Sequence, residues 1–169
     1  GGTWEWAKSV GAYSYIFGVD IDSSGDAYVT GYFRSSYINF GSTNLSNTNS
    51  TGNIADIFVA KISSGGVWQW AKSVGGSGHE YSLASETDSN GNTYLTGYYY
   101  SSSISFGSTT LSNPATWHTL FVAKINSTGD WKWATTVSSS SSAAHSSGNS
   151  ITLDSSGNAY LTGNYYAGS

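Results

Sequence analysis

The chain has 169 residues, a length that predicts one domain or part of a larger one, with room for a buried core. Only 9% of its residues are charged, against roughly 25% in average soluble domains, so Ser, Thr, Asn, Gly and Tyr must supply most of its surface. Six basic residues against ten acidic ones (net charge −4) argue against a nucleic-acid partner, and the absence of cysteine excludes disulfides, thiol nucleophiles and thiolate metal sites.

The sequence contains no apolar run of the about 18 residues that a membrane span needs, so we predict none. It begins at Gly1 without an initiator methionine or a signal peptide, which indicates a processed product or a fragment. Glycosylation triplets begin at Asn44, Asn49 and Asn126, but a chain so rich in Asn, Ser and Thr forms such triplets by chance.

The predicted elements, taken in chain order, are short strands. Each is rich in Val, Ile, Thr, Tyr, Phe and Trp and is bounded by Gly, Ser, Asn or Asp, and no segment shows a helical period. The first, within residues 1–11, is an orphan strand that we label D. The next four are A (16–22), B (27–33), C (57–62) and D (67–74), with A and B joined by an Asp-Ser-Ser-Gly hairpin turn.

Four sequence blocks recur in fixed order with a period of about 64 residues, the mark of a repeat architecture. The blocks are Trp-x-Trp-Ala at 4–10, 68–74 and 131–137, Asp-Ser-x-Gly at 22–31, 88–97 and 154–163, Ile-x-Phe-Gly-Ser-Thr at 38–43 and 104–109, and Phe-Val-Ala-Lys-Ile at 58–62 and 121–125.

Both faces of the predicted sheet are largely apolar. With a period of two, Trp68, Trp70 and Val74 of strand D share one face, and Ala71 lies on the other. A sandwich sheet normally has one wet face, whereas a sheet stacked between two neighbours must be apolar or small on both. The pattern therefore predicts an all-β protein of four-stranded antiparallel β-propeller-type blades.

The recurring Trp and Gly positions are predicted to form the core between blades. A Gly inside strand B indicates close approach by a neighbouring backbone or a large ring, and a Trp of the adjacent blade is the favoured candidate. The positions are Trp4, Trp6, Trp68, Trp70, Trp131, Trp133, Gly31, Gly97 and Gly163.

These four ordered blocks resemble the SBBP family of bacterial β-propeller repeats, and the resemblance covers essentially the whole chain. It departs locally, for example at Thr135, where the other copies have Lys8 and Lys72. The resemblance implies a four-stranded blade but no single activity, because propellers include both enzymes and binding modules.

The strand order predicts two complete blades, 12–75 and 76–138, between the orphan strand D of 1–11 and an orphan A-B hairpin in 139–169. Known propellers have about four to eight blades, so the repeat region 1–169 would leave sheet edges open. Two interpretations remain: the chain is part of a larger propeller, or it assembles with copies of itself.

Asp20, Asp22 and Asp26 resemble the start of a calcium loop, with carboxylates at alternating positions and a Gly at the turn. The later copies lack this acidic pattern, and a hairpin turn capped by Asp explains what all three share. Calcium is therefore a possible ligand of the first copy alone, and no other cofactor is predicted.

Several aromatic residues are candidates for ligand contact. Trp117 and His118 lie in the long connection between strands B and C of the second blade, and an aromatic cluster stands at the end of its strand B. Flat rings of this kind stack on sugar faces. The candidate ligand-binding residues are Trp117, His118, Tyr98, Tyr99 and Tyr100.

The sequence does not predict an enzyme. His79, His118 and His145 are interpreted as solvated loop residues, and no nucleophile elbow, phosphate-binding loop or paired acidic constellation is present. We expect a non-catalytic structural or adhesive module of a secreted or cell-surface protein that binds protein or glycan. The alternatives are a glycan-binding propeller and a module that self-associates by strand addition through its open edges.

Overall fold

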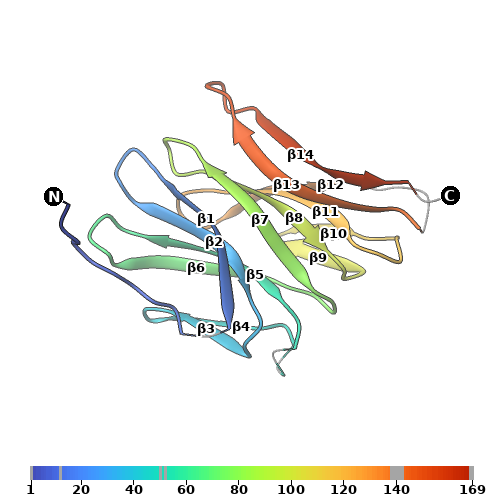
Figure 1. The fold of residues 1–169 in the computed structure, drawn as a ribbon, viewed down its shortest axis with the longest axis horizontal. Helices are drawn as coiled ribbons and strands as arrows, with labels where there is room; N and C mark the ends of the chain where they lie inside the picture. Colours follow the sequence, from blue (N-terminus) through green and yellow to red (C-terminus); the bar gives the residue numbers. More distant parts are fainter. Residues whose placement is uncertain (1, 12, 50, 52, 138–142, 168–169) are drawn as a thin grey trace.

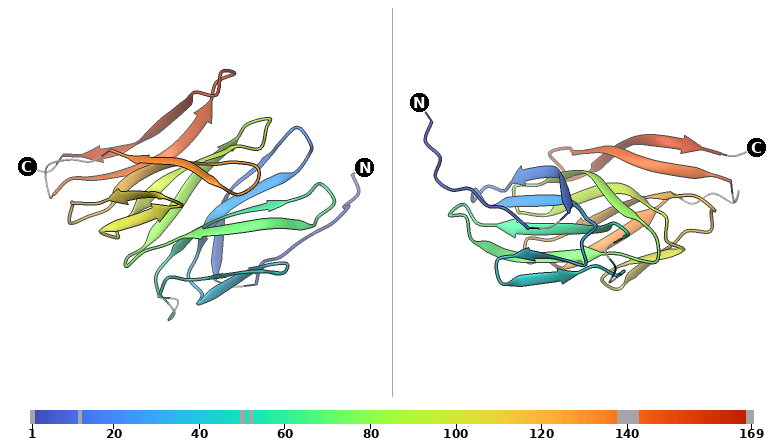
Figure 2. Two further views of the ribbon diagram at one scale, coloured as in Figure 1. Left: turned by 180° about the vertical axis from the view of Figure 1, so that it is seen from behind. Right: turned by 60° about the horizontal axis from the view of Figure 1, so that its bottom comes forward.

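The computed structural model describes residues 2–11, 13–49, 51, 53–137 and 143–167, which form β-strands, turns and extended segments. Two four-stranded antiparallel sheets and a two-stranded hairpin follow one another across the molecule (Figure 1, Figure 2). Their order confirms the predicted blades. The strands are β1 (Ser14–Ile21), β2 (Ala27–Phe33), β5 (Asp56–Ile62) and β6 (Trp68–Val74) in the first blade, β7 (Glu80–Thr87), β8 (Thr93–Tyr99), β11 (Thr119–Ile125) and β12 (Trp131–Thr136) in the second, and β13 (His145–Leu153) and β14 (Ala159–Tyr166) in the hairpin.

Neighbouring blades pack face to face. Strand β7 contacts β1, β2 and β5 of the preceding blade, and β13 contacts β7, β8 and β11 in the same way. The predicted orphan strand D is not part of a sheet. Residues 2–11 pair with no strand in the described part of the chain. No helix among the described residues is long and apolar enough to cross a membrane.

The connection between the second and third strands of each blade is a hairpin rather than an open loop. In the first blade it is β3 (Tyr37–Phe40) and β4 (Thr43–Ser46), and in the second β9 (Ser103–Phe106) and β10 (Thr109–Ser112). Each hairpin contacts the fourth strand of its own blade. Ile38 and Phe40 lie fully in the core, so the Phe-Gly-Ser-Thr block serves packing.

The two Trp residues of each Trp-x-Trp block lie on opposite faces of the sheet, which corrects the period-two prediction. A β-bulge pairs Trp68 with Ile62 but Trp70 with the adjacent Lys61, so the intervening Gln69 is the extra residue. Trp68 packs with Phe40 on one face, and Trp70 joins the core shared with the second blade on the other.

The second blade repeats this arrangement, because Trp131 pairs with Ile125 and Trp133 with Lys124. Trp131 joins the core between the first and second blades. The predicted core role is wrong for Trp4, which is 94% exposed, and only partial for Trp6 and Trp133, each 37% exposed.

The glycines of the second strand meet backbone rather than an indole ring. A Cβ at Gly31, Gly97 or Gly163 would overlap a carbonyl oxygen of the strand before it, Tyr15, Tyr81 or Ser147. At each place the first strand of the blade has a bulge, which brings its carbonyl group inward. The predicted close approach is therefore made by a backbone, and the favoured Trp is wrong.

Candidate functional site

The candidate site is a band of aromatic rings at one end of the blades. The hairpin of strands one and two brings the start of one strand beside the end of the other, so residues far apart in the repeat become neighbours. The register pairs Tyr15 with Tyr32, and Tyr81 with Tyr98. We call this set the aromatic band: Tyr13, Tyr15, Tyr32, His79, Tyr81, Tyr98, Tyr100, His118, His145 and Tyr166.

The rings of the aromatic band contact one another without interruption across both blades and the β13–β14 hairpin. Neighbouring rings are tilted, stacked or edge-to-face, the arrangements that aromatic pairs prefer. One continuous path is Tyr15 to Tyr32 (centroids 5.0 Å apart), Tyr81 (4.8 Å), Tyr98 (5.1 Å), His118 (4.6 Å), His145 (5.3 Å) and Tyr166 (5.0 Å).

The aromatic band is partly exposed to solvent. Tyr13, Tyr15, Tyr100 and Tyr166 are exposed, while the rings between them are partly buried. Burial lowers the pKa of His118, with a further contribution from the neighbouring His145. The imidazole of His118 is therefore favoured in its neutral form at pH 7.

Arg34 is the cation of the band. Its Nη2 donates a 2.8 Å hydrogen bond to the hydroxyl of Tyr81, and its Cζ lies 6.0 and 5.9 Å from the ring centroids of Tyr32 and Tyr81. Since Tyr32 belongs to the first blade and Tyr81 to the second, the guanidinium spans the junction between them.

The structure brings together three of the five predicted ligand residues. Tyr98, Tyr100 and His118 are mutual neighbours in the aromatic band. Tyr99 is buried, with its hydroxyl donating to the carbonyl of Ser112, and so belongs to the core. Trp117 is 55% exposed, but its ring makes none of the contacts that define the band.

Sequence reasoning missed most of the band. His79 and His145 were interpreted as solvated, yet both contact tyrosines of the band. The available signal was the recurrence of an aromatic at equivalent places, Tyr15 and Tyr81 before the bulge and Tyr32 and Tyr98 after the strand glycine. Only the register shows that these places adjoin.

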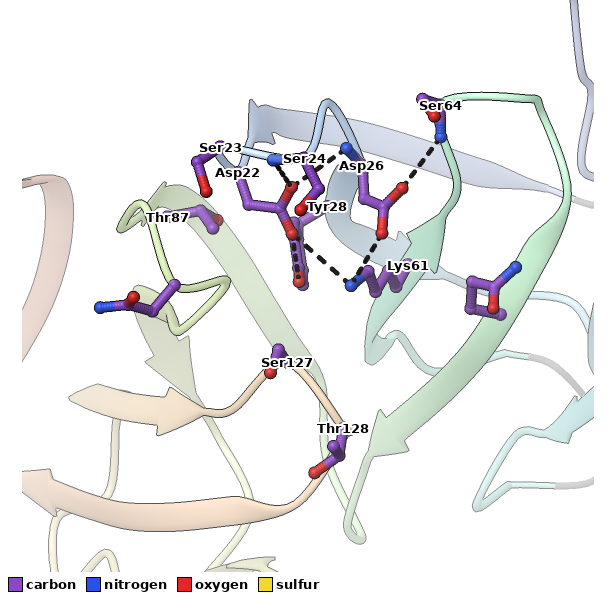
Figure 3. Close-up of polar contacts among 12 residues, drawn as sticks. Asp22, Ser23, Ser24, Asp26, Tyr28, Lys61, Ser64, Thr87, Ser127 and Thr128 are labelled. Atoms are coloured by element: carbon purple, nitrogen blue, oxygen red, sulfur yellow. Dashed lines mark hydrogen bonds and ion pairs between the residues drawn. The ribbon is translucent and has the colours of Figure 1, made fainter.

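The opposite end of the blades, where Ile21 pairs with Ala27, carries the Asp turns, and Figure 3 shows the turn of the first blade. Asp22 accepts hydrogen bonds from the backbone N–H groups of Ser24 (2.9 Å) and Asp26 (3.1 Å), and from the hydroxyl of Tyr28 (3.1 Å). The Nζ of Lys61 lies 3.0 Å from Asp26 and 3.5 Å from Asp22. Burial acts to raise the pKa of Asp22, but these hydrogen bonds and Lys61 bring it below its ordinary value.

This geometry gives the carboxylates of the predicted calcium loop other partners. Lys61 forms ion pairs with both Asp22 and Asp26, and Asp20 instead accepts a 3.1 Å hydrogen bond from Ser85 of the second blade. Among the described residues, no group of three or more His, Asp or Glu side chains could hold a metal ion.

The turn itself is common to all three repeats. Asp88 and Asp154 each accept the same two backbone N–H bonds as Asp22, and the amides of Asn92 and Asn158 bind their second carboxylate oxygen. The aspartate therefore stabilises the hairpin turn in every copy.

Comparison with known families gives one match. The family model SBBP, described as a beta-propeller repeat, matches residues 133–164. This segment runs from Trp133 through the hairpin β13–β14, whose blocks recur in the two earlier repeats. The match confirms the resemblance to this family, and the fold is a run of β-propeller-type blades. No curated protein matches the chain.

Proposed function

We propose that the chain is a non-catalytic adhesive module of a secreted or cell-surface protein, and that the aromatic band binds a glycan. The stacked blades serve as a rigid platform, and the band is the contact surface. The observation that carries the proposal is the unbroken path of rings over both blades and the β13–β14 hairpin, at one end of the molecule.

The position of the rings supports a binding role. Tyr15, Tyr32, Tyr81 and Tyr98 lie on paired strands, so their backbone is ordered before any ligand arrives. A preorganised surface loses less conformational entropy on binding than a mobile loop does. The band therefore suits the contact role better than the β3–β4 and β9–β10 hairpins, which pack against the fourth strand of their blades.

The chemistry of the rings supports a glycan. Within the described part of the chain, the hydroxyls of Tyr32, Tyr98 and Tyr100 make no hydrogen bond to protein, so they can pair with sugar hydroxyls. Their ring faces suit the C–H faces of sugars. A band with so few charges matches a ligand that is rich in hydroxyl groups.

The surroundings of the histidines support a binding rather than a catalytic role. His79 accepts a 3.1 Å hydrogen bond at Nδ1 from the backbone N–H of Ala55, and His118 faces His145 and two tyrosines. These partners are backbone and rings, not a nucleophile or a carboxylate. The extracellular setting is proposed from the uncharged polar surface.

A glycan array is the direct test. The wild-type chain should bind a subset of glycans, and the double variant Tyr98→Ala/Tyr100→Ala should lose most of that signal. Tyr37→Ala is the matched control, because Tyr37 is 53% exposed in β3 and lies outside the band. Absence of binding to any glycan, or full retention by the double variant, would refute the proposal. If the double variant does not fold, the single variant Tyr100→Ala, at a more exposed ring, provides the test instead.

Self-association is a second candidate, supported by a different observation. Ile16, Val19 and Ile21 of β1 are 56, 66 and 68% exposed, on a strand whose counterparts pack against a preceding blade. We propose that a further blade, of this chain or of a second copy, covers this strand. Light scattering after size exclusion should give a dimer or larger species that Val19→Lys dissociates, and a wild-type monomer would refute self-association.

A further inference from the structure

Arg34 is fixed in place but incompletely satisfied. Its backbone N–H donates a 2.8 Å hydrogen bond to the carbonyl of Tyr13, and Nη2 donates to Tyr81. Its Nε is buried and has no hydrogen-bond partner in the described structure. A guanidinium carries five N–H donors, so most of the donor capacity of Arg34 is unused.

No carboxylate of the described structure forms an ion pair with Arg34. Both ion pairs found there belong to Lys61, at the other end of the blades. Burial raises the pKa of the Tyr32 and Tyr98 hydroxyls, and Arg34 opposes that effect at both. The other named contributions come from neighbouring tyrosines, so the charge acting on these rings is the positive charge of Arg34, although the chain as a whole carries −4.

We propose that the ligand of the aromatic band is an acidic glycan, whose anionic group binds the guanidinium of Arg34 while adjacent sugar rings lie on the tyrosines. This inference rests on the proposed glycan-binding function. Arg forms paired N–H bonds to carboxylate and to similar oxyanions, and a charge-assisted bond next to partly buried rings is stronger than one in open water. An acidic sugar supplies the missing counter-charge and the stacking face in one molecule.

The choice of a glycan over an acidic peptide follows from the surroundings of Arg34. A peptide that bound by charge alone would be held at a single point, because Arg34 is the only arginine of the chain and no lysine is among the residues of the aromatic band. The rings beside it, in contrast, continue in an unbroken path onto the second blade and the β13–β14 hairpin.

Calorimetric titration of the purified chain tests this assignment. The probes are oligogalacturonate, its methyl ester as a neutral match, a sulfated oligosaccharide and poly-glutamate. The proteins are wild type, Arg34→Lys, Arg34→Gln and Lys132→Gln, which removes one exposed positive charge from β12. Thermal melting of each variant confirms that it is folded.

We expect at least one of the two acidic oligosaccharides to bind the wild type at least about tenfold more tightly than the neutral ester. The carboxylated and sulfated probes show which anionic group is preferred. Arg34→Gln should lose at least about tenfold in affinity, Arg34→Lys should lose less, and Lys132→Gln should remain close to wild type.

Two results separate failure of this inference from failure of the function beneath it. If the neutral ester binds as well as both acidic sugars, the inference is overturned and glycan binding stands. If no sugar binds, or only poly-glutamate does, both are overturned. Should Arg34→Gln fail to fold, the comparison of acid with ester on the wild type still decides the question.

Discussion

The indole N–H of Trp70, in β6 of the first blade, donates a 3.0 Å hydrogen bond to the carbonyl of Ser127, in the turn between β11 and β12 of the second. Trp6 makes the equivalent bond, 2.8 Å long, to Ser64 of the first blade. In both cases the ring also lies against the left-handed glycine of that turn, Gly129 or Gly66. Trp70 thus joins the first blade to the second, and Trp6 attaches the segment of residues 2–11 to the first blade in the same way.

This joint predicts a large effect of Trp70→Ala on stability. The change removes the hydrogen bond to Ser127 and leaves a cavity in the core between blades, so the free energy of unfolding should fall by about 3 kcal/mol. Urea denaturation measures it. Trp4→Ala, at a 94% exposed ring, is the control and should change stability by less than about 0.5 kcal/mol. Equal effects of the two variants would contradict the role of Trp70 in joining the blades.

The bulge beside Gly97 predicts that even a methyl group is not tolerated there. In Gly97→Ala the new Cβ would overlap the carbonyl oxygen of Tyr81, and neither residue can move away easily because both lie on paired strands. We expect a loss of about 3 kcal/mol in thermal or urea unfolding. In Gly65→Ala the nearest atom to the new Cβ is 3.9 Å away, so this matched change should be nearly neutral. A stable Gly97→Ala protein would show that the bulge can relax.

Glu80 predicts a pH dependence of stability. Its side chain is fully buried and accepts hydrogen bonds from Ser101 and from the backbone N–H of Gly76 (3.0 Å). Burial, with the nearby Asp56 carboxyl, raises the pKa of Glu80 from 4.5 to about 8. A raised pKa favours the protonated form in the folded state. Ionisation of Glu80 therefore destabilises the folded state. This loss of stability is absent below pH 4.5, grows as the pH rises, and is complete above about pH 8.

Glu80→Gln should remove this loss of stability. The variant and the wild type should have similar stability near pH 4, and the variant should be more stable by a few kcal/mol near pH 8. Urea unfolding at pH 4, 6 and 8 measures the difference. Glu5→Gln, at an exposed position, is the control. A difference that does not grow between pH 4 and pH 8 would show that Glu80 is ionised in the folded protein.

The ion pairs of Lys61 predict that calcium does not bind the first turn. Calcium would have to displace the ammonium group that is already paired with Asp22 and Asp26, so titration with calcium should release no heat. Asp22→Ala should instead lower the free energy of unfolding by about 1 to 3 kcal/mol, because two turn N–H groups lose their acceptor. Saturable heat with the wild type that Asp22→Ala abolishes would contradict this interpretation.

The repeat, the four strands of each blade and the Asp-capped turns could all be predicted from the sequence, because they depend on local chemistry that occurs two or three times. The faces of Trp68 and Trp70 could not, since one extra residue, Gln69, reverses the alternation without leaving a sign in the sequence. The partner predicted for Gly97, a Trp ring, was wrong for the same reason. A bulge in the neighbouring strand places the carbonyl of Tyr81 against Gly97.

The candidate site shows the same limit at longer range. Tyr98 and Tyr100 were found because they belong to one run of three tyrosines, and Tyr99 was wrongly included because alternation places it in the core. Tyr32 and Tyr81 were missed, although their rings are 4.8 Å apart, because they belong to different blades. A site built across blade junctions is visible only once the stacking of the blades is known.

The central claim is that tyrosines, not the exposed Trp117, contact the ligand. Saturation-transfer NMR measures this directly in two deuterated samples, one with protonated tyrosine rings and one with protonated tryptophan rings, each mixed with the glycan that binds best. Strong transfer to the sugar from the tyrosine sample and little from the tryptophan sample is the predicted result. Transfer from the tryptophan sample alone would contradict the assignment of the aromatic band as the binding surface.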